Sequence, residues 1–343
     1  MKRFLFASVS LLAIGFTASA YAGGSSSFTS QTGTNQTLTI DQTGGNNNQV
    51  GTGINPFLQE NGAGTGGNVI NITQTGANNT FGVGIASVQS GTQNFANINQ
   101  SGSNSSVNLR QIGNFNGVSN DHDASDGIAA EVVGENEGSF IKQSASFSSV
   151  NVFETGNGNA FFITQQGGTK NAIGVTQQGD ENYVTMNQNG SSLFASVGQF
   201  GTLNTVTSTQ TGVGNQLFAG QTGNNNVLNN DQSGFSNVLV STQVGSGNVL
   251  NSTQSNAGNF ASFFQSGTGN LLTNIQSGIG NQAFATQLGN FQVANLTQTG
   301  NANTIVGFQS GVGTNTATVV QSTNGNLANY SQVGTGHVAT IHQ

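Results

Sequence analysis

Side chains suited to metal binding or acid–base catalysis are few in this sequence. Its 343 residues include three histidines, twelve acidic residues and no cysteine. His122, His337 and His342 are too scattered along the chain to predict a metal site. The stretch Asp121–Asp126 offers three clustered aspartates of the kind that bind Ca²⁺, but it lacks the glycine and glutamate spacing of calcium loops. We therefore interpret it as a solvated acidic loop and expect no metal.

Two further patterns bear on catalysis and cofactors. Gly62-x-Gly64-x-x-Gly67 has the spacing of a dinucleotide-binding fingerprint, but 51 glycines make such matches a product of composition, and no helix is expected after it. No Ser–His–acid grouping stands out among the many serines. The formal net charge is −7, and no basic groove accompanies the phenylalanines, which argues against nucleic acid binding. We expect a protein that is not an enzyme and has no cofactor.

The dominant feature is a glutamine that recurs every eleven residues. The unit reads Gln-x-Gly-x-x-Asn-x-(Leu/Ala/Val)-x-x-x, and a repeat this regular indicates one small structural unit stacked many times. The glutamines are Gln188, Gln199, Gln210, Gln221, Gln232, Gln243, Gln254, Gln265, Gln276, Gln287, Gln298 and Gln309. The asparagines five residues later are Asn204, Asn215, Asn226, Asn237, Asn248, Asn259, Asn270, Asn281 and Asn303. The glycines two residues after a glutamine are Gly190, Gly201, Gly212, Gly223, Gly234, Gly245, Gly267, Gly278, Gly289, Gly300 and Gly311.

Eleven residues are too few for a strand and a helix but suit one strand and a tight turn. Counting back from each glutamine by twos places the asparagine, the apolar residue and the glutamine on one face of a strand. We therefore predict an all-β fold, a β-solenoid whose 22-residue coils each hold two facing strands. Glutamine would lie over glutamine and asparagine over asparagine, so that the buried amides bond to one another. The glycine falls in the connection, where a positive φ is expected, and roughly fourteen coils would form a rod about 65 Å long.

Interruptions of the repeat divide the chain into segments. Pro56 marks an excursion from the stack, because proline cannot donate to a β ladder. The predicted segments are a flexible lead at 23–30, a first array at 31–116 that is irregular at 50–73, an acidic irregular insert at 117–142, and a second array at 143–343.

The start of the second array departs from the pattern. Glu154 takes a ladder position, where an ionised carboxylate would be costly, and we interpret it as a local weak point. Gln166 and Gln177 are expected to continue the ladder after a slip of one residue. The perfect run then begins at Gln188.

The first 22 residues have the features of a secretory signal peptide. Lys2 and Arg3 precede an apolar run at 4–16 and a small-residue cleavage site at Ala20–Ala22. The apolar run is too short to span a membrane. Removal of this segment leaves three basic and twelve acidic residues, and 3 − 12 = −9. We expect a secreted protein that is stabilised without disulfides, by backbone pairing and packing.

No helix, proline block or charged repeat that would cap the arrays is evident at their ends. An uncapped coil presents a row of unpaired N–H and C=O groups, which can pair with another copy. We therefore predict that the rods add to one another end to end and form a cross-β fibre.

The repeat resembles the curlin repeat of curli fibre subunits, the functional amyloid of bacterial biofilms. Ser331–Gln343 is similar to the closing repeat of those subunits, and the likeness covers most of 31–116 and 143–343. The resemblance implies that the ladder glutamines and asparagines guide stacking. It also implies secretion through a dedicated outer-membrane channel, assembly from a nucleator subunit at the cell surface, and a role in matrix and adhesion. The array is longer than a typical curlin array, and the glycine-rich lead that addresses such chains to their channel is hard to recognise in 23–30.

Two alternatives remain open beside the fibre subunit. One is a nucleator of a related fibre subunit. The other is a monomeric β-solenoid binding module, such as an adhesin or an ice-binding protein. A flat ligand-binding face would need one regular outward array, but the outward row Thr205, Thr207 and Thr209 is not repeated on neighbouring coils.

Overall fold

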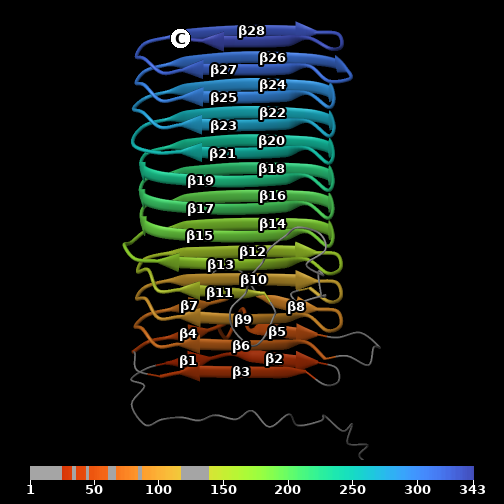
Figure 1. The fold of residues 1–343 in the computed structure, drawn as a ribbon. Helices are drawn as coiled ribbons and strands as arrows, with labels where there is room; N and C mark the ends of the chain where they lie inside the picture. Colours follow the sequence, from red (N-terminus) through yellow and green to blue (C-terminus); the bar gives the residue numbers. More distant parts are fainter. Residues whose placement is uncertain (1–24, 33–35, 44–45, 61–66, 84–86, 117–138) are drawn as a thin grey trace, which may run out of the picture.

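The computed structural model describes residues 25–32, 36–43, 46–60, 67–83, 87–116 and 139–343. The predicted signal peptide lies outside these residues, as do most of the acidic insert, His122 and the first two glycines of the fingerprint-like motif. The described chain forms a rod of stacked coils, in which two β-sheets face each other along the whole stack (Figure 1).

The two sheets consist of parallel strands with matching order along the rod. Sheet A contains β1 (Ser26–Ser27), β2 (Thr29–Thr32), β4 (Gln49–Val50), β5 (Phe57–Glu60), β7 (Thr80–Phe81), β8 (Val88–Ser90), β10 (Ser106–Ile112), β12 (Ser149–Thr155), β14 (Ala172–Asp180), β16 (Phe194–Thr202), β18 (Gln216–Asn224), β20 (Val238–Ser246), β22 (Phe260–Thr268), β24 (Gln282–Asn290), β26 (Thr304–Val312) and β28 (Leu327–Val333). Sheet B contains β3 (Thr37–Gln42), β6 (Val69–Gln74), β9 (Phe95–Gln100), β11 (Phe140–Gln143), β13 (Ala160–Gln166), β15 (Tyr183–Ser191), β17 (Thr205–Val213), β19 (Val227–Phe235), β21 (Val249–Gln254), β23 (Leu271–Gln276), β25 (Val293–Gln298), β27 (Thr316–Gln321) and β29 (Val338–His342).

The register confirms the predicted β-solenoid with coils of 22 residues. Gln210 pairs with Gln188 in the preceding coil and with Gln232 in the following one. Sheet B has 13 strands, so the described rod has 13 coils rather than the roughly fourteen expected. The difference arises because insertions use residues without adding coils: Gln111 pairs with Glu154, 43 positions later.

The core between the sheets is a thin apolar layer. In eleven of the twelve units of the perfect run, the residue seven positions after the ladder glutamine is apolar, points inward and is fully buried, as Leu217, Leu228, Leu239 and Leu250 show. Burial of one leucine side chain stabilises the fold by about 1.5–3 kcal/mol. Parallel strands with the same register place these leucines in continuous columns, so each new coil covers the apolar surface of the last.

The N-terminal segment is more ordered than its composition suggests. Residues 23–30 were expected to be a flexible lead, but Ser26–Ser27 pairs with β4 and Thr29–Thr32 with β5. The backbone N–H of Phe28 donates to the carbonyl of Val50 at 2.7 Å, which ties this segment to the next coil.

The irregular region at 50–73 contains a coil with a loop inside it. Pro56 lies in the connection just before β5, where no ladder N–H is needed, as predicted. Phe57 and Gln59 follow it on the inward face and are fully buried. The glutamine that continues the array is therefore Gln59, at 28 rather than 22 residues from Gln31.

The ladder position assigned to Gln166 is wrong by one residue. Gln165 is fully buried and bonds to Gln143, whereas Gln166 is exposed at the end of β13. The extra residue lies in the connection after β13, where Gly167, Gly168 and Lys170 have positive φ. Sequence spacing alone does not show on which side of a glutamine pair a single insertion falls.

The sharpest bend of each unit lies four residues after the ladder glutamine, not at the glycine two residues after it. In all twelve units of the perfect run the residue at this bend has a positive φ, for example Leu203 (58°), Gly247 (64°) and Phe291 (58°). Several strands continue past the glycine, so that Gly201 and Gly223 are paired within β16 and β18. Glycine, asparagine and larger residues all occur at the bend.

Glycine can be needed in this corner for two reasons, a positive φ and the close approach of the next coil. Two glycines of one corner allow the two effects to be measured separately. At Gly247 an added Cβ would meet open space, so Gly247→Ala carries only the cost of a left-handed alanine, about 1–2 kcal/mol. At Gly245 an added Cβ would overlap the carbonyl of Gly267 in the next coil, so Gly245→Ala should destabilise the chain considerably more. Guanidinium unfolding followed by circular dichroism measures both variants, and equal midpoints would contradict the close approach at Gly245.

Candidate functional site

The candidate site is a network of buried side-chain amides that extends along the rod. Gln210 is typical: its Nε2 donates to Gln232 Oε1 at 2.8 Å and to the carbonyl of Phe194 at 3.0 Å. Its own Oε1 accepts from Gln188 Nε2 at 2.8 Å. Phe194 begins a strand of the opposite sheet. Gln210 therefore bonds to the coil on either side and also links the two sheets.

These bonds form two ladders, one in each sheet, with Nε2–Oε1 distances of 2.5–3.1 Å. All twelve glutamines of the perfect run belong to them. The sheet A ladder contains Gln31, Gln59, Gln89, Gln111, Glu154, Gln177, Gln199, Gln221, Gln243, Gln265, Gln287, Gln309 and Gln332. The sheet B ladder contains Gln42, Gln74, Gln100, Gln143, Gln165, Gln188, Gln210, Gln232, Gln254, Gln276, Gln298, Gln321 and Gln343.

The asparagines form a second set of columns at the corners. Asn204 Oδ1 accepts the backbone N–H of Asn226 at 3.1 Å, and Asn204 Nδ2 donates to the carbonyl of Gly223 at 2.7 Å. All nine predicted asparagines are fully buried. They satisfy corner backbone groups that the β ladder leaves free, which a buried corner requires.

Several residues of these columns were not predicted, among them Gln292, Asn315 and His337. Gln292 replaces an asparagine, accepting from Asn315 Nδ2 at 2.8 Å and donating to the carbonyl of Gly311 at 3.1 Å. Asn315 comes six rather than five residues after its glutamine because one residue is inserted there. The backbone N–H of His337 donates to Asn315 Oδ1 at 3.0 Å. The twelve-residue step from Gln309 to Gln321 was the sequence signal for the shift at Asn315.

The predicted turn glycines share a close backbone approach rather than a common φ. Nine of the eleven have positive φ, but Gly278 and Gly300 do not. At all eleven, an added Cβ would overlap a backbone carbonyl of the next coil. The carbonyl facing Gly234 belongs to Asn256, the residue that breaks the glycine pattern. Glycine is therefore needed because adjacent coils nearly touch at this corner.

Glu154 occupies a ladder position and is fully buried. Its Oε2 accepts from Gln111 Nε2 at 2.9 Å, while its Oε1 has no hydrogen-bond partner. Burial raises the pKa of this carboxyl to about 8, against a smaller lowering by the Gln111 bond. The sequence indicated a weak point here, and the structure shows which oxygen lacks a partner.

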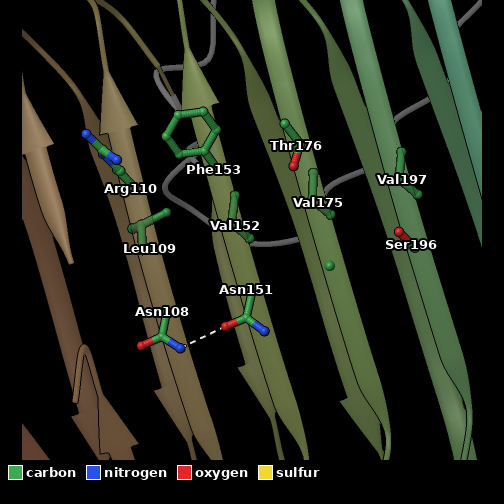
Figure 2. A pocket seen from close by; sticks show the side chains of 11 residues that line it. Asn108, Leu109, Arg110, Asn151, Val152, Phe153, Val175, Thr176, Ser196 and Val197 are labelled. Atoms are coloured by element: carbon green, nitrogen blue, oxygen red, sulfur yellow. Dashed lines mark hydrogen bonds between the residues drawn. The ribbon is translucent and has the colours of Figure 1, made fainter. Parts of the chain in front are cut away.

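A hollow of about 360 Å³ lies on the outer surface of sheet A. Gly174 leaves it open, because no side chain fills the space between Asn151 and Ser196 (Figure 2). The Arg110 guanidinium lies 5.2 Å from the centre of the Phe153 ring beside it. The residues that line the hollow include neither a histidine nor a carboxylate, so the hollow offers no acid–base pair.

Metal binding and membrane spanning are two further possibilities for the same residues. Within the described ranges, no three His, Cys, Asp or Glu side chains lie close enough together to hold a metal ion. The part of the chain described here also contains no helix long and apolar enough to cross a membrane.

Comparison with known proteins addresses the repeat directly. Residues 168–201 match the family model of the curlin associated repeat. This chain carries a curlin repeat in that segment. The matched segment covers β14, β15 and β16, whose ladder glutamines are Gln177, Gln188 and Gln199. A search of curated protein sequences gives no match. The coils that follow the matched segment have the same 22-residue register and the same glutamine ladder bonds.

Removal of consecutive ladder amides tests the energetic role of the network. Replacement of Gln210, Gln232 and Gln254 by alanine removes their bonds to the facing sheet and leaves the fully buried Gln188 Nε2 and Gln276 Oε1 without their ladder partners, and each such group costs about 1–3 kcal/mol. We expect the guanidinium midpoint of the triple variant to fall well below that of the unmodified chain.

The matched control replaces Thr209, Thr242 and Thr253, which point outward on the same or neighbouring strands, by alanine. This control should change the midpoint only slightly. Equal losses in the two triple variants would contradict the role assigned to the inward amides.

Proposed function

We propose that the protein is a secreted structural subunit that self-assembles end to end into curli-like extracellular amyloid fibres, serving biofilm matrix and surface adhesion. The curlin repeat and the β-solenoid fold support this proposal. The observation that carries it is the chemical complementarity of the two end faces of the rod.

At one end of the rod the ladders present donors. Gln332 Nε2 donates to the carbonyl of Thr316 and Gln343 Nε2 to that of Leu327, at 3.0 and 3.2 Å. Among the described residues, no further coil accepts the second N–H of these amides. At the other end, the described residues provide no donor to Oε1 of Gln31 or Gln42. The donor end of one copy therefore matches the acceptor end of another.

The backbone and core are complementary in the same way. Among the described strands, β28 pairs only with β26, and β29 only with β27. Ala339 and Ile341 on the inward face of β29 are half-exposed, although Ala317 and Val319 at the same positions of β27 are fully buried. A second copy stacked here would bury this face. Because the contact is head to tail and does not close, it would propagate into a filament.

The family likeness supports the remaining parts of the proposal. From the likeness to curlin-repeat proteins, we infer that this chain forms a homopolymer at the cell surface, with a nucleator subunit and a dedicated outer-membrane secretion channel as its partners. On this proposal the ladder glutamines and asparagines guide the stacking of copies as they do the stacking of coils.

X-ray diffraction from the assembled chain tests the proposal. Long unbranched fibres should give reflections at about 4.7–4.8 Å and about 10 Å, the strand and sheet spacings of a cross-β structure. A chain that stays monomeric with β-rich circular dichroism would overturn the fibre proposal and favour a binding module. A chain that forms little fibre but accelerates a related subunit would instead be a nucleator.

A charge on the end face should stop growth. Ile341→Lys would place an unpaired ammonium between two copies, which costs several kcal/mol, whereas the isolated chain leaves this position half-exposed. We expect Ile341→Lys to form few fibres and to block elongation of unmodified seeds in a thioflavin T assay.

Thr340→Lys adds the same charge to the same strand, but on the outward, exposed side. It should assemble at close to the unmodified rate. Equal assembly of the two lysine variants would show that copies do not join through this face.

A further inference from the structure

The sheet A ladder is interrupted at one point among the described residues, between Glu154 and Gln177. These residues are register partners in adjacent strands, and both are fully buried. Elsewhere each ladder amide donates an N–H to the oxygen of the next residue. Glu154 Oε1 and Gln177 Oε1, by contrast, both lack a hydrogen-bond partner. Two acceptors thus meet where the ladder requires a donor and an acceptor.

A carboxylate cannot supply the missing bond, because both of its oxygens only accept. A protonated carboxyl has an O–H in the place where glutamine has its N–H, and is otherwise nearly the same size and shape. We propose that Glu154 and Gln177 form a buried proton-binding site. Glu154 Oε1 takes a proton from solvent, and the resulting O–H donates to Gln177 Oε1 and closes the ladder. Between about pH 4.5 and about pH 8, the site binds a proton when the coil is folded and releases it to solvent when the coil opens.

Among the described residues, no other group near Glu154 compensates for a negative charge. On the neighbouring strands, Arg110 of β10, Lys142 of β11 and Asp180 of β14 are all exposed on the outer surface. Strands β9 and β13 contribute no titratable side chain, and Glu154 is the one such group of β12. Burial accordingly raises the pKa of Glu154 to about 8.

The direction of the pH dependence follows from this environment. Between about pH 4.5 and about pH 8 the folded chain retains a proton that the unfolded chain has lost. The unfolding equilibrium therefore shifts toward the unfolded chain as the pH rises through this window, by up to about tenfold per pH unit. Below the window both states are protonated, and above it neither is, so the dependence ends on both sides.

The position of the site gives this dependence a structural meaning. Glu154 lies on β12, which stacks on β10 across the 43-residue step between the two arrays. The bond that the proton supplies joins β12 to β14, so it would strengthen the first coil of the second array, on which the first array rests, most strongly in acid.

The test compares the full chain with Glu154→Gln, which supplies a permanent amide donor. Unfolding by guanidinium is followed at about pH 5.5 and about pH 9 under conditions where the chain is not fibrillar. The unmodified chain should lose stability at the higher pH. Glu154→Gln should keep at both pH values the midpoint that the unmodified chain shows in acid. An unchanged pH dependence in Glu154→Gln would overturn the proposal.

Two controls separate this site from other causes. Asp180→Asn removes an exposed carboxyl from the adjacent strand and should leave the pH dependence unchanged. Infrared spectroscopy of the folded chain near neutral pH should show the C=O stretch of a protonated carboxyl, and Glu154→Gln should lack it. Absence of this band in the unmodified chain would contradict proton binding. So would a recovery of the unfolding midpoint of the unmodified chain at alkaline pH when Na⁺, K⁺ or Ca²⁺ is added. None of these measurements requires the chain to form fibres.

Discussion

The structure depends on one requirement: amide side chains placed between two sheets must find hydrogen-bond partners there. An unpartnered buried amide costs several kcal/mol, which is a large part of the stability of a domain. A glutamine such as Gln210 meets the requirement through the coils above and below it and through the facing sheet. These partners exist only if every coil places the same residue at the same height. The monotony of the sequence is thus a condition for burying amides at all.

The parts of the fold that belong to a single unit could be predicted from the sequence. The period, the inward face and the ladder residues of the perfect run follow from alternation within one strand. Features that depend on how coils meet could not be predicted. Leu203 and Phe291 give no sign that their positions require positive φ, and Gln292 does not resemble the asparagines whose column it continues. The assignment of Gln166 was wrong because an insertion is placed by pairing in space.

Departures from the repeat are tolerated where a neighbouring coil provides a partner. Asn230 and Asn274 lie on the inward face of sheet B beside serines, and each donates to a serine of the preceding coil, at 2.9 and 3.1 Å. Their Oδ1 atoms remain without partners, yet no charge is involved. Glu154 differs because its replacement of an amide removes a donor and adds an ionisable group. The stack therefore tolerates an uncharged polar side chain on its inward face more readily than a side chain that replaces a hydrogen-bond donor by an ionisable acceptor.

The two sheets carry the same inward order of asparagine, apolar residue and glutamine, so each coil consists of two nearly equivalent halves. A rotation of half a turn about the rod axis brings one ladder onto the other. Gain or loss of eleven residues would move every later strand to the opposite sheet and still leave glutamine stacked on glutamine. The chain can thus be lengthened by one eleven-residue unit, half a coil, without disturbing the register of its glutamines, as the uniform run from Gln188 to Gln309 illustrates.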